Sequence, residues 1–155
     1  MKNGKAKGSG FERLVAKAFS DVFGVEFRRT PMSGGWSHDN PQVAGDLVCM
    51  DPTFDFPFCI ECKNSEGWKL ESLFTDNHKW FDDWWKQLIR ECPVGKAGIL
   101  VFTRNRAPVF AAASDHMHYS CQRIIVPGAW WIYIYEFNLF MDCLRHDESV
   151  VKRTI

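Results

Sequence analysis

The chain of 155 residues has no long apolar run of the kind that marks a targeting or membrane segment. No apolar stretch of signal-peptide length follows Met1, and none approaches the roughly 18 residues that a membrane-spanning helix needs. We therefore expect an intracellular protein in the cytoplasm, or in the cytoplasm of a host cell if the source is a virus.

The sequence also has no disulfide framework and no excess of either charge. Its six cysteines are widely spaced, which is typical of buried thiols in a reducing compartment, so we expect no disulfide bond. The 19 basic residues are balanced by 19 acidic ones, which argues mildly against a nucleic-acid partner. However, residues 1–29 carry seven positive and three negative side chains, a local balance of +4 that is compatible with a DNA-binding face. The side chains expected to contact DNA are Lys5, Lys7, Arg13, Arg28 and Arg29.

Apolar residues are plentiful, at 46% hydrophobic and 15% aromatic, and no repeat or linker divides them, so one domain over residues 1–155 is expected. After a flexible basic leader at 1–8, helical periodicity predicts helices over 10–23 and 77–91. Residues 30–42, rich in proline, glycine and serine, predict a long loop.

Strand patterns complete the expected architecture. They cover 25–29, 44–50, 58–63, 97–103, 108–113 and 130–137. We expect 44–50 and 58–63 to pair as a hairpin and 108–113 to lie at a sheet edge, while the tail is ambiguous. This order predicts an α/β fold with a mixed sheet.

The sharpest chemical signal combines Asp46 with Glu61 and Lys63. Residues two apart on a strand point to the same face, so Glu61 and Lys63 project together, and Asp46 joins them if its strand is adjacent. Two carboxylates at one point repel each other unless a cation lies between them. Oxygen ligands suit Mg²⁺ or Mn²⁺ better than zinc, so we expect a magnesium site at which manganese can substitute.

A divalent ion at this point favours hydrolysis of phosphodiester bonds, because it can polarise a phosphate oxygen and activate a water molecule. Lys63 would position or deprotonate that water, or neutralise charge in the transition state. The backbone carbonyl of Cys62 offers a further oxygen ligand. The alternative is a solvated strand face that carries an ordinary cross-strand ion pair.

Glu12 supports the metal-site interpretation independently. On a helical wheel it falls between Val15 and Phe23, inside the apolar arc, and a buried carboxylate requires a partner. It is therefore a candidate third carboxylate of the metal site. The alternative is a capping box, in which Ser9 and Glu12 cap the first helical turn reciprocally.

Other residues suggest sites that we do not favour. Zinc ligands could be drawn from Cys59, Cys62, His116, His118 and Cys121, but residues three apart on a strand face opposite sides. Trp80, Trp84 and Trp85 recur at helical spacing and are expected in the core instead of on DNA bases. Gln87 either orients an active-site water or fills a polar gap. The apolar run 130–135 suits a central strand or a dimer interface.

Four segments, in this order, resemble archaeal-type and phage Holliday junction resolvases of the PD-(D/E)xK nuclease superfamily. They are Gly8-Ser9-Gly10-Phe11-Glu12-Arg13, Arg28-Arg29-Thr30-Pro31-Met32-Ser33-Gly34-Gly35, Gly45-Asp46-Leu47 and Ile60-Glu61-Cys62-Lys63. The resemblance implies a restriction-endonuclease-like αβββαβ core with helices flanking the sheet. It also implies a homodimer that cuts four-way DNA junctions with Mg²⁺.

The resemblance also implies roles for single residues. Glu12, Asp46 and Glu61 would be metal-site carboxylates and Lys63 the catalytic lysine. Ser33 would lie near the scissile phosphate, and the guanidinium groups of Arg28 and Arg29 would contact backbone phosphates. Gly45 stands where the superfamily has proline, which supplies no ligand, and the segment Trp36–Asn40 has no assigned role.

The leading hypothesis is thus a metal-dependent endodeoxyribonuclease that resolves four-way junctions by paired cuts. A second hypothesis keeps the chemistry and changes the substrate, as in a repair or restriction-like nuclease. A third is a DNA-binding module without catalysis, or an interaction protein stabilised by zinc. The complete set Glu12, Asp46, Glu61 and Lys63 argues against the third.

Overall fold

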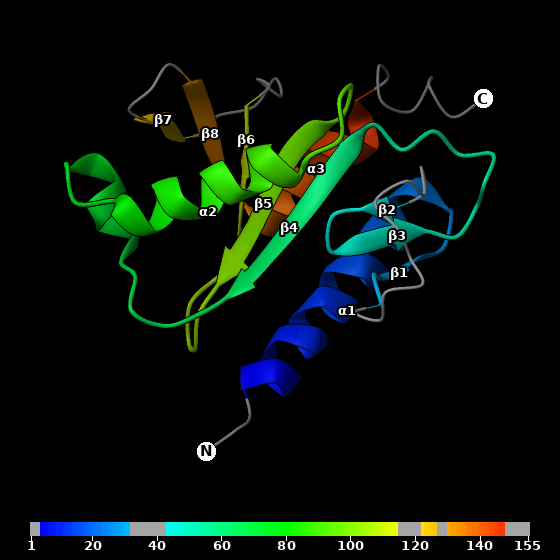
Figure 1. The fold of residues 1–155 in the computed structure, drawn as a ribbon, viewed down its shortest axis with the longest axis horizontal. Coiled ribbons are helices and arrows are strands. Elements are labelled where there is room, and N and C mark those ends of the chain that lie inside the picture. Colours follow the sequence, from blue (N-terminus) through cyan, green and yellow to red (C-terminus); the bar gives the residue numbers. More distant parts are fainter. Residues whose placement is uncertain (1–3, 32–42, 115–121, 127–129, 148–155) are drawn as a thin grey trace.

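The structure is a computed structural model that describes residues 4–31, 43–114, 122–126 and 130–147 (Figure 1). Its elements, in chain order, are α1 (Gly4–Phe23), β1 (Phe27–Arg29), β2 (Val43–Ala44), β3 (Leu47–Cys49), β4 (Phe58–Asn64), the 3₁₀ helix η1 (Leu70–Phe74), α2 (Lys79–Glu91), β5 (Ala97–Thr103), β6 (Phe110–Ala113), β7 (Gln122–Val126), β8 (Trp130–Glu136) and α3 (Phe137–His146). No helix in these ranges is long and apolar enough to cross a membrane.

Five strands form a mixed sheet in the order β4-β5-β6-β8-β7. β4 and β5 are parallel, with Phe58 opposite Ala97 and Asn64 opposite Thr103, whereas the other neighbours are antiparallel. Parallel strands need a crossover connection, and α2 provides it between β4 and β5. The strands β1, β3 and β2 form a separate antiparallel sheet in that order.

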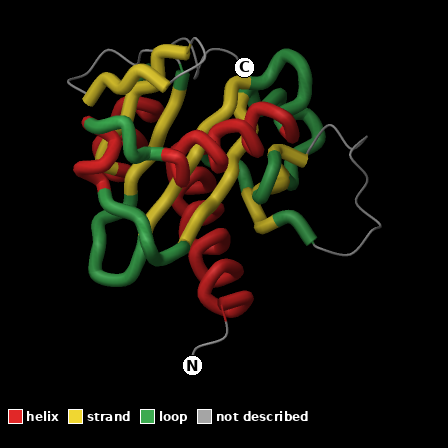
Figure 2. The backbone as a smooth tube through the Cα atoms, turned by 60° about the vertical axis from the view of Figure 1, so that its left-hand side comes forward, coloured by secondary structure: helices red, strands yellow, loops and turns green. Residues whose placement is uncertain are grey.

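Helices cover both faces of the five-stranded sheet (Figures 1 and 2). α1 and α3 pack on one face and α2 on the other. β5 is buried between these layers: Ile99 and Val101 join the core beneath α1, and Leu100 and Phe102 join the core beneath α2. Burial on both faces explains its continuous apolar sequence. The expected α/β fold, with a mixed sheet between helices, is confirmed.

Helix α1 begins at Gly4, so the expectation of a flexible leader over 1–8 is wrong from Gly4 onward. Lysine and alanine favour helix formation, and Lys7 is anchored by a 2.6 Å ion pair with Glu66. The capping box, the alternative role for Glu12, is also wrong, because Ser9 lies inside the helix and its hydroxyl donates to the carbonyl of Ala6 at 3.2 Å.

The expected hairpin between 44–50 and 58–63 is wrong. The left-handed φ of +70° at Gly45 ends β2 and lets the chain turn into β3. β3 then pairs with β1 and β2. Among the described residues before β4, only Gly45 forms a bridge to this strand, in parallel with Ile60.

The second half of the sheet differs from expectation at one strand and adds two elements. β6 lies between β5 and β8 instead of at an edge, because its short alanine side chains leave room for the cores on both faces. The sequence patterns missed β7, which pairs with β8, and α3, which packs on the α1 side of the sheet. The helix predicted over 77–91 begins two residues later, at Lys79.

Candidate active site

The turn at Gly45 places Asp46 against β4, the outer strand of the five-stranded sheet. A Cβ atom at Gly45 would collide with the carbonyl oxygen of Ile60, so this close approach requires glycine. The N–H of Asp46 donates to that same carbonyl at 2.8 Å. The carbonyl of Asp46 accepts from the N–H of Thr30 at 2.7 Å, which ties the turn to the chain after β1.

The backbone of β4 also holds the side chain of Asp46. Its Oδ2 atom accepts a 2.7 Å hydrogen bond from the N–H of Cys62. Successive residues of a strand direct their backbone groups to alternate edges, so Ile60 and Cys62 both face the turn. The carbonyl of Cys62 therefore opens to the same edge as the Asp46 carboxyl.

Glu61 and Lys63 project toward α2, as their spacing of two residues on β4 predicts. Glu61 is only 6% exposed, and its Oε1 lies 2.8 Å from Nζ of Lys63. That ammonium also donates to Oε1 of Gln87, on α2, at 2.9 Å. Gln87 in turn donates to Oε1 of Glu91 at 3.3 Å. The oxygen of Gln87 is thus directed at Lys63. The sequence alone did not indicate which group Gln87 contacts.

Glu12 is paired with Arg29. Its Oε2 lies 2.7 Å from Nε of Arg29, and both side chains are largely covered, at 20% and 27% exposure. The helical wheel therefore placed Glu12 correctly on an inner face of α1. The partner that its burial requires is an arginine of β1.

The carboxyl of Asp46 has an unusual proton affinity. Burial, followed by repulsion from Glu61, raises its pKa from 3.8 to about 7, against the lowering effect of the Cys62 N–H. The charge of Glu12 raises the pKa of Asp46 further, and that of Lys63 lowers it. The other three side chains predicted as a site therefore all act on the carboxyl of Asp46 at the outer edge of β4.

The residues at this edge fit an oxygen-seeking divalent cation in part. The half-buried carboxyl of Asp46, the buried carboxyl of Glu61 and the Cys62 carbonyl are the donors that Mg²⁺ and Mn²⁺ take. A bound cation would relieve the repulsion that raises the pKa of Asp46. Within the described ranges, however, no three His, Cys, Asp or Glu side chains are already arranged as a metal cluster. Glu12 would have to leave Arg29 to become a third ligand.

The other predicted residues are scattered. Arg28 is 61% exposed and pairs with Glu26 at 2.7 Å, and Arg13 is exposed on α1. Lys5 and Lys7 lie in the first turns of α1. Ser33 and the segment 36–40 lie outside the described residues, so no position is given for the predicted loop serine.

The zinc and base-stacking alternatives find no support in the described ranges. Cys59 packs in the core beneath α2 and Cys62 in the core beneath α1, so the two thiols lie on opposite faces as strand geometry predicts. The other candidate zinc ligands, His116, His118 and Cys121, lie outside the described residues. Trp85 is 2% exposed, and Trp80 and Trp84 pack against the same core.

No sequence pattern indicated a role for Thr30. Its hydroxyl donates to the carbonyl of Gly45 at 2.8 Å, so Thr30 braces both carbonyls of the turn that carries Asp46. No spacing rule connects Thr30 with Gly45, because fourteen positions separate them in the sequence.

Comparison with known proteins identifies a family for this chain. The model of the family described as "Phage putative PDDEXK endonuclease" matches residues 3–139, a range that contains all four residues of the predicted site. No curated protein and no solved structure matches the chain. The mixed sheet between helices agrees with the restriction-endonuclease-like fold of PD-(D/E)xK nucleases, which typically use divalent metal ions. Because the match covers most of its length, the chain belongs to the phage PDDEXK endonuclease family, which implies a nuclease.

Proposed function

We propose that this chain is a metal-dependent endodeoxyribonuclease that cuts four-way DNA junctions, with Asp46, Glu61 and Lys63 as its catalytic residues. The observation that carries the proposal is their convergence at the outer edge of β4. There two carboxyls, those of the half-buried Asp46 and the buried Glu61, lie beside an ammonium group that two acceptors orient.

Asp46, Glu61 and the carbonyl of Cys62 would hold Mg²⁺, with Mn²⁺ as a substitute. The bound ion supplies Lewis-acid polarisation of the phosphate and a water of lowered pKa. Hydrolysis of the DNA backbone would join the oxygen of a water molecule to phosphorus and break one P–O bond, with one proton of the water passing to the leaving oxygen through the solvent. Lys63, held by Glu61 and Gln87, donates to a phosphate oxygen as negative charge accumulates there.

Glu12 and Arg29, which are paired with each other, would both take part in the reaction. A DNA phosphate beside Arg29 offers its guanidinium a second anion, which releases Glu12 as a third carboxylate for the metal. The loop serine, Ser33, would act near the scissile phosphate, as the resemblance to Holliday junction resolvases implies.

The four-way junction as substrate and the homodimer as active form both draw on that resemblance. A two-fold dimer holds two sites in a symmetric relation, so that two strands of a junction can be cut in a pair. β8, which was a candidate for the interface, is buried by its own chain at Ile132, Ile134 and Tyr135. It therefore gives the dimer no separate support.

The test is cleavage of an end-labelled four-way junction, beside nicked duplex, duplex and single-stranded DNA, in Mg²⁺ and in EDTA. The proposal expects paired, Mg²⁺-dependent cuts at the junction that disappear in Glu61→Gln. The matched control is Asp21→Asn, which removes one carboxylate that is 57% exposed on α1.

The outcomes test the nuclease activity, the junction specificity and the active site separately. Cuts that occur equally in plain duplex would keep the nuclease and discard junction specificity, in favour of a repair or restriction-like enzyme. Binding to all four DNAs without cutting would favour a DNA-binding module. Cutting that survives Glu61→Gln would remove the proposed active site.

A further inference from the structure

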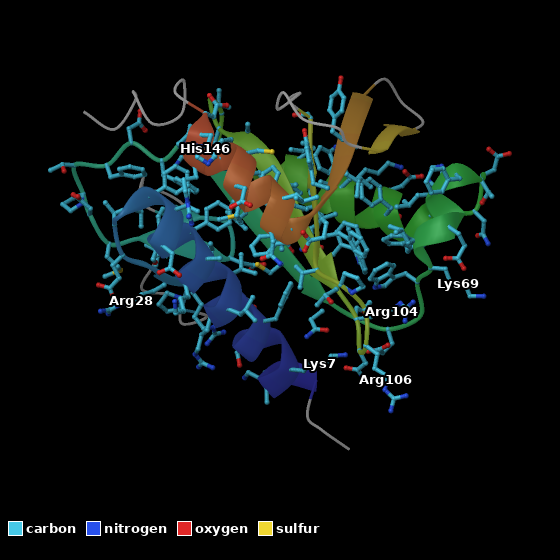
Figure 3. All side chains as sticks on the ribbon, turned by 180° about the vertical axis from the view of Figure 1, so that it is seen from behind. Lys7, Arg28, Lys69, Arg104, Arg106 and His146 are labelled. Carbon is cyan, nitrogen blue, oxygen red and sulfur yellow. The ribbon has the colours of Figure 1, made fainter. Side chains whose placement is uncertain are left out.

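Four basic side chains gather at the carboxyl ends of β4 and β5 (Figure 3). They are Lys7 from α1, Lys69 from the segment after β4, and Arg104 and Arg106 from the turn between β5 and β6. The sequence patterns singled out only Lys7. Three segments far apart in the chain thus bring positive charge to one end of the molecule.

Glu66 joins these segments. Its Oε1 accepts from Nζ of Lys7 at 2.6 Å and from the N–H of Asn105 at 2.9 Å. The charge of Arg104 also acts on this carboxylate and helps to hold its pKa below the ordinary value, after the larger effects of its bonds to Lys7 and Asn105. One carboxylate therefore ties Lys7 to the turn that carries Arg104 and Arg106. Among the described residues, Lys69, Arg104 and Arg106 have no acidic partner within ion-pair distance.

Arg104 is placed by an aromatic ring. Its guanidinium carbon lies 5.3 Å from the ring centroid of Trp68, within the range of a cation–π interaction. Trp68 is 3% exposed and packs on Trp80 at 5.1 Å, so its ring is not available to stack on a base. In the described part of the chain, the buried Nε of Arg104 has no hydrogen-bond acceptor.

Arg106 occupies a conformation that favours glycine. Its φ is +60°, and it is the one residue other than glycine with a positive φ in the described ranges. It is exposed, so packing does not explain an arginine here. Arg106 is thus an exposed cation in a strained backbone conformation, which indicates a use for its side chain.

Arg104 lies beside the candidate active site. Lys63 is opposite Phe102 in the parallel pair, and Arg104 follows two residues beyond, roughly 7 Å along the strand. Each strand of duplex DNA has one phosphate per roughly 3.4 Å of helix axis. A strand cut at Lys63 would therefore bring its next phosphates over Arg104.

We propose that Lys7, Lys69, Arg104 and Arg106 form a phosphate-binding surface that holds the backbone of a duplex DNA arm next to the bond to be cut. The inference rests on the proposed function for the identity of the ligand. Charged side chains without an accessible base-stacking ring bind phosphates independently of sequence, which suits an enzyme that selects DNA by shape. A single strand would require a stacking platform, and Trp68 is covered.

The experiment measures the salt dependence of DNA binding in EDTA, where no cutting is expected, by the anisotropy of a labelled junction, duplex and single strand. The test variant is Lys69→Gln with Arg106→Gln, two exposed residues. The matched control is Lys17→Gln with Arg90→Gln, also exposed at 77% and 74%, at the far end of α1 and of α2.

Each phosphate contact contributes about 0.9 to the slope of log affinity against log salt concentration. The test variant should therefore lower the slope for the junction and the duplex by about 1.8, and the control should leave it unchanged. Melting curves verify that every variant is folded.

Equal slopes for the test and control variants would contradict the proposed phosphate-binding surface. A reduction of the slope confined to single-stranded DNA would contradict it as well. Absence of binding by the unmodified protein would overturn it as well. Cleavage by the unmodified protein in Mg²⁺ is measured in parallel. Cutting with unchanged slopes would reject the surface alone, whereas reduced slopes without any cutting would keep the surface and reject the proposed nuclease.

Discussion

Oε1 of Gln87 lies 2.9 Å from Nζ of Lys63, so a residue of α2 orients the ammonium group of a residue of β4. A hydrogen bond to a charged group contributes about 1.5–3 kcal/mol, which corresponds to roughly 10- to 100-fold in rate. Gln87→Ala should therefore lower kcat by that factor and leave DNA affinity unchanged. The neighbouring exposed residue provides the control, Lys86→Ala. A wild-type kcat for Gln87→Ala would show that Lys63 needs no orientation from α2.

Loss of any one of the three converging charges should stop the reaction without unfolding the protein. We expect Asp46→Asn, Glu61→Gln and Lys63→Ala each to lower the cleavage rate by about 100-fold or more, because transition-state charge loses its stabilisation. Binding of a junction in EDTA should persist. Circular dichroism and binding are measured together, and a variant that loses both its fold and its binding would count against a catalytic role for that residue.

The turn before Asp46 should be intolerant of a side chain. Gly24 and Gly45 have nearly the same φ, +69° and +70°, but a Cβ atom at Gly24 meets nothing within 4 Å, whereas at Gly45 it collides with the Ile60 carbonyl. Gly24→Ala should therefore cost about 1 kcal/mol of unfolding free energy, from backbone strain alone.

Gly45→Ala should cost more than twice as much and also reduce cleavage, because relief of the collision displaces Asp46. Urea denaturation of both variants measures the difference. Equal losses of stability would mean that the turn can move away from β4 without penalty.

Without metal, the stability of the protein should depend on pH through Asp46. Burial and the charge of Glu61 raise its pKa from 3.8 to about 7, so the native state binds a proton that the unfolded state has already released. This contribution to stability is fully present below about pH 4 and is lost as the pH rises through about 7. Asp46→Asn removes the dependence, since the amide is neutral throughout.

Melting temperatures in EDTA between about pH 5 and pH 9 should therefore fall more steeply for the unmodified protein than for Asp46→Asn. Mn²⁺ should stabilise the unmodified protein more at about pH 8 than at about pH 6, because metal binding requires the deprotonated carboxyl. Parallel curves for the two proteins would contradict the raised pKa.

The two adjacent arginines of β1 should behave differently. Arg28 is 61% exposed, so Arg28→Ala should lower the salt slope of DNA binding by about 0.9 and spare the rate at saturating DNA. Arg29 is paired with Glu12, so Arg29→Ala should also reduce the cleavage rate. In a double-mutant cycle, the effects of Arg29→Ala and Glu12→Gln on the rate should not add. Additive effects would separate Glu12 from Arg29.

The local patterns predicted the parts of the fold that depend on periodicity. The strand over 97–103 is confirmed to the residue as β5, and the paired projection of Glu61 and Lys63 follows from strand alternation alone. The inner position of Glu12 likewise follows from the helical wheel. Such features depend on the geometry of one element, which its own sequence determines.

Pairing between elements was not predictable in the same way. The hairpin expected before β4 fails because one left-handed glycine, Gly45, redirects the chain, and a strand pattern does not reveal the sign of φ. Arg29 finds its partner on α1, and Lys63 finds its second partner, Gln87, on α2. Arg104 owes its place to Trp68, thirty-six residues earlier. These contacts exist only after the layers have packed.

The position of Asp46 has a consequence for solubility as well as for chemistry. β4 is the outermost strand of its sheet, and its sequence, Phe-Cys-Ile-Glu-Cys-Lys-Asn, is largely apolar. The exposed backbone of such a strand is a template for pairing with a second chain. Asp46 covers part of this backbone, with its N–H on the Ile60 carbonyl and its carboxyl on the Cys62 N–H. A substitution that loosens the turn would therefore open an edge for aggregation as well as disturb the candidate active site.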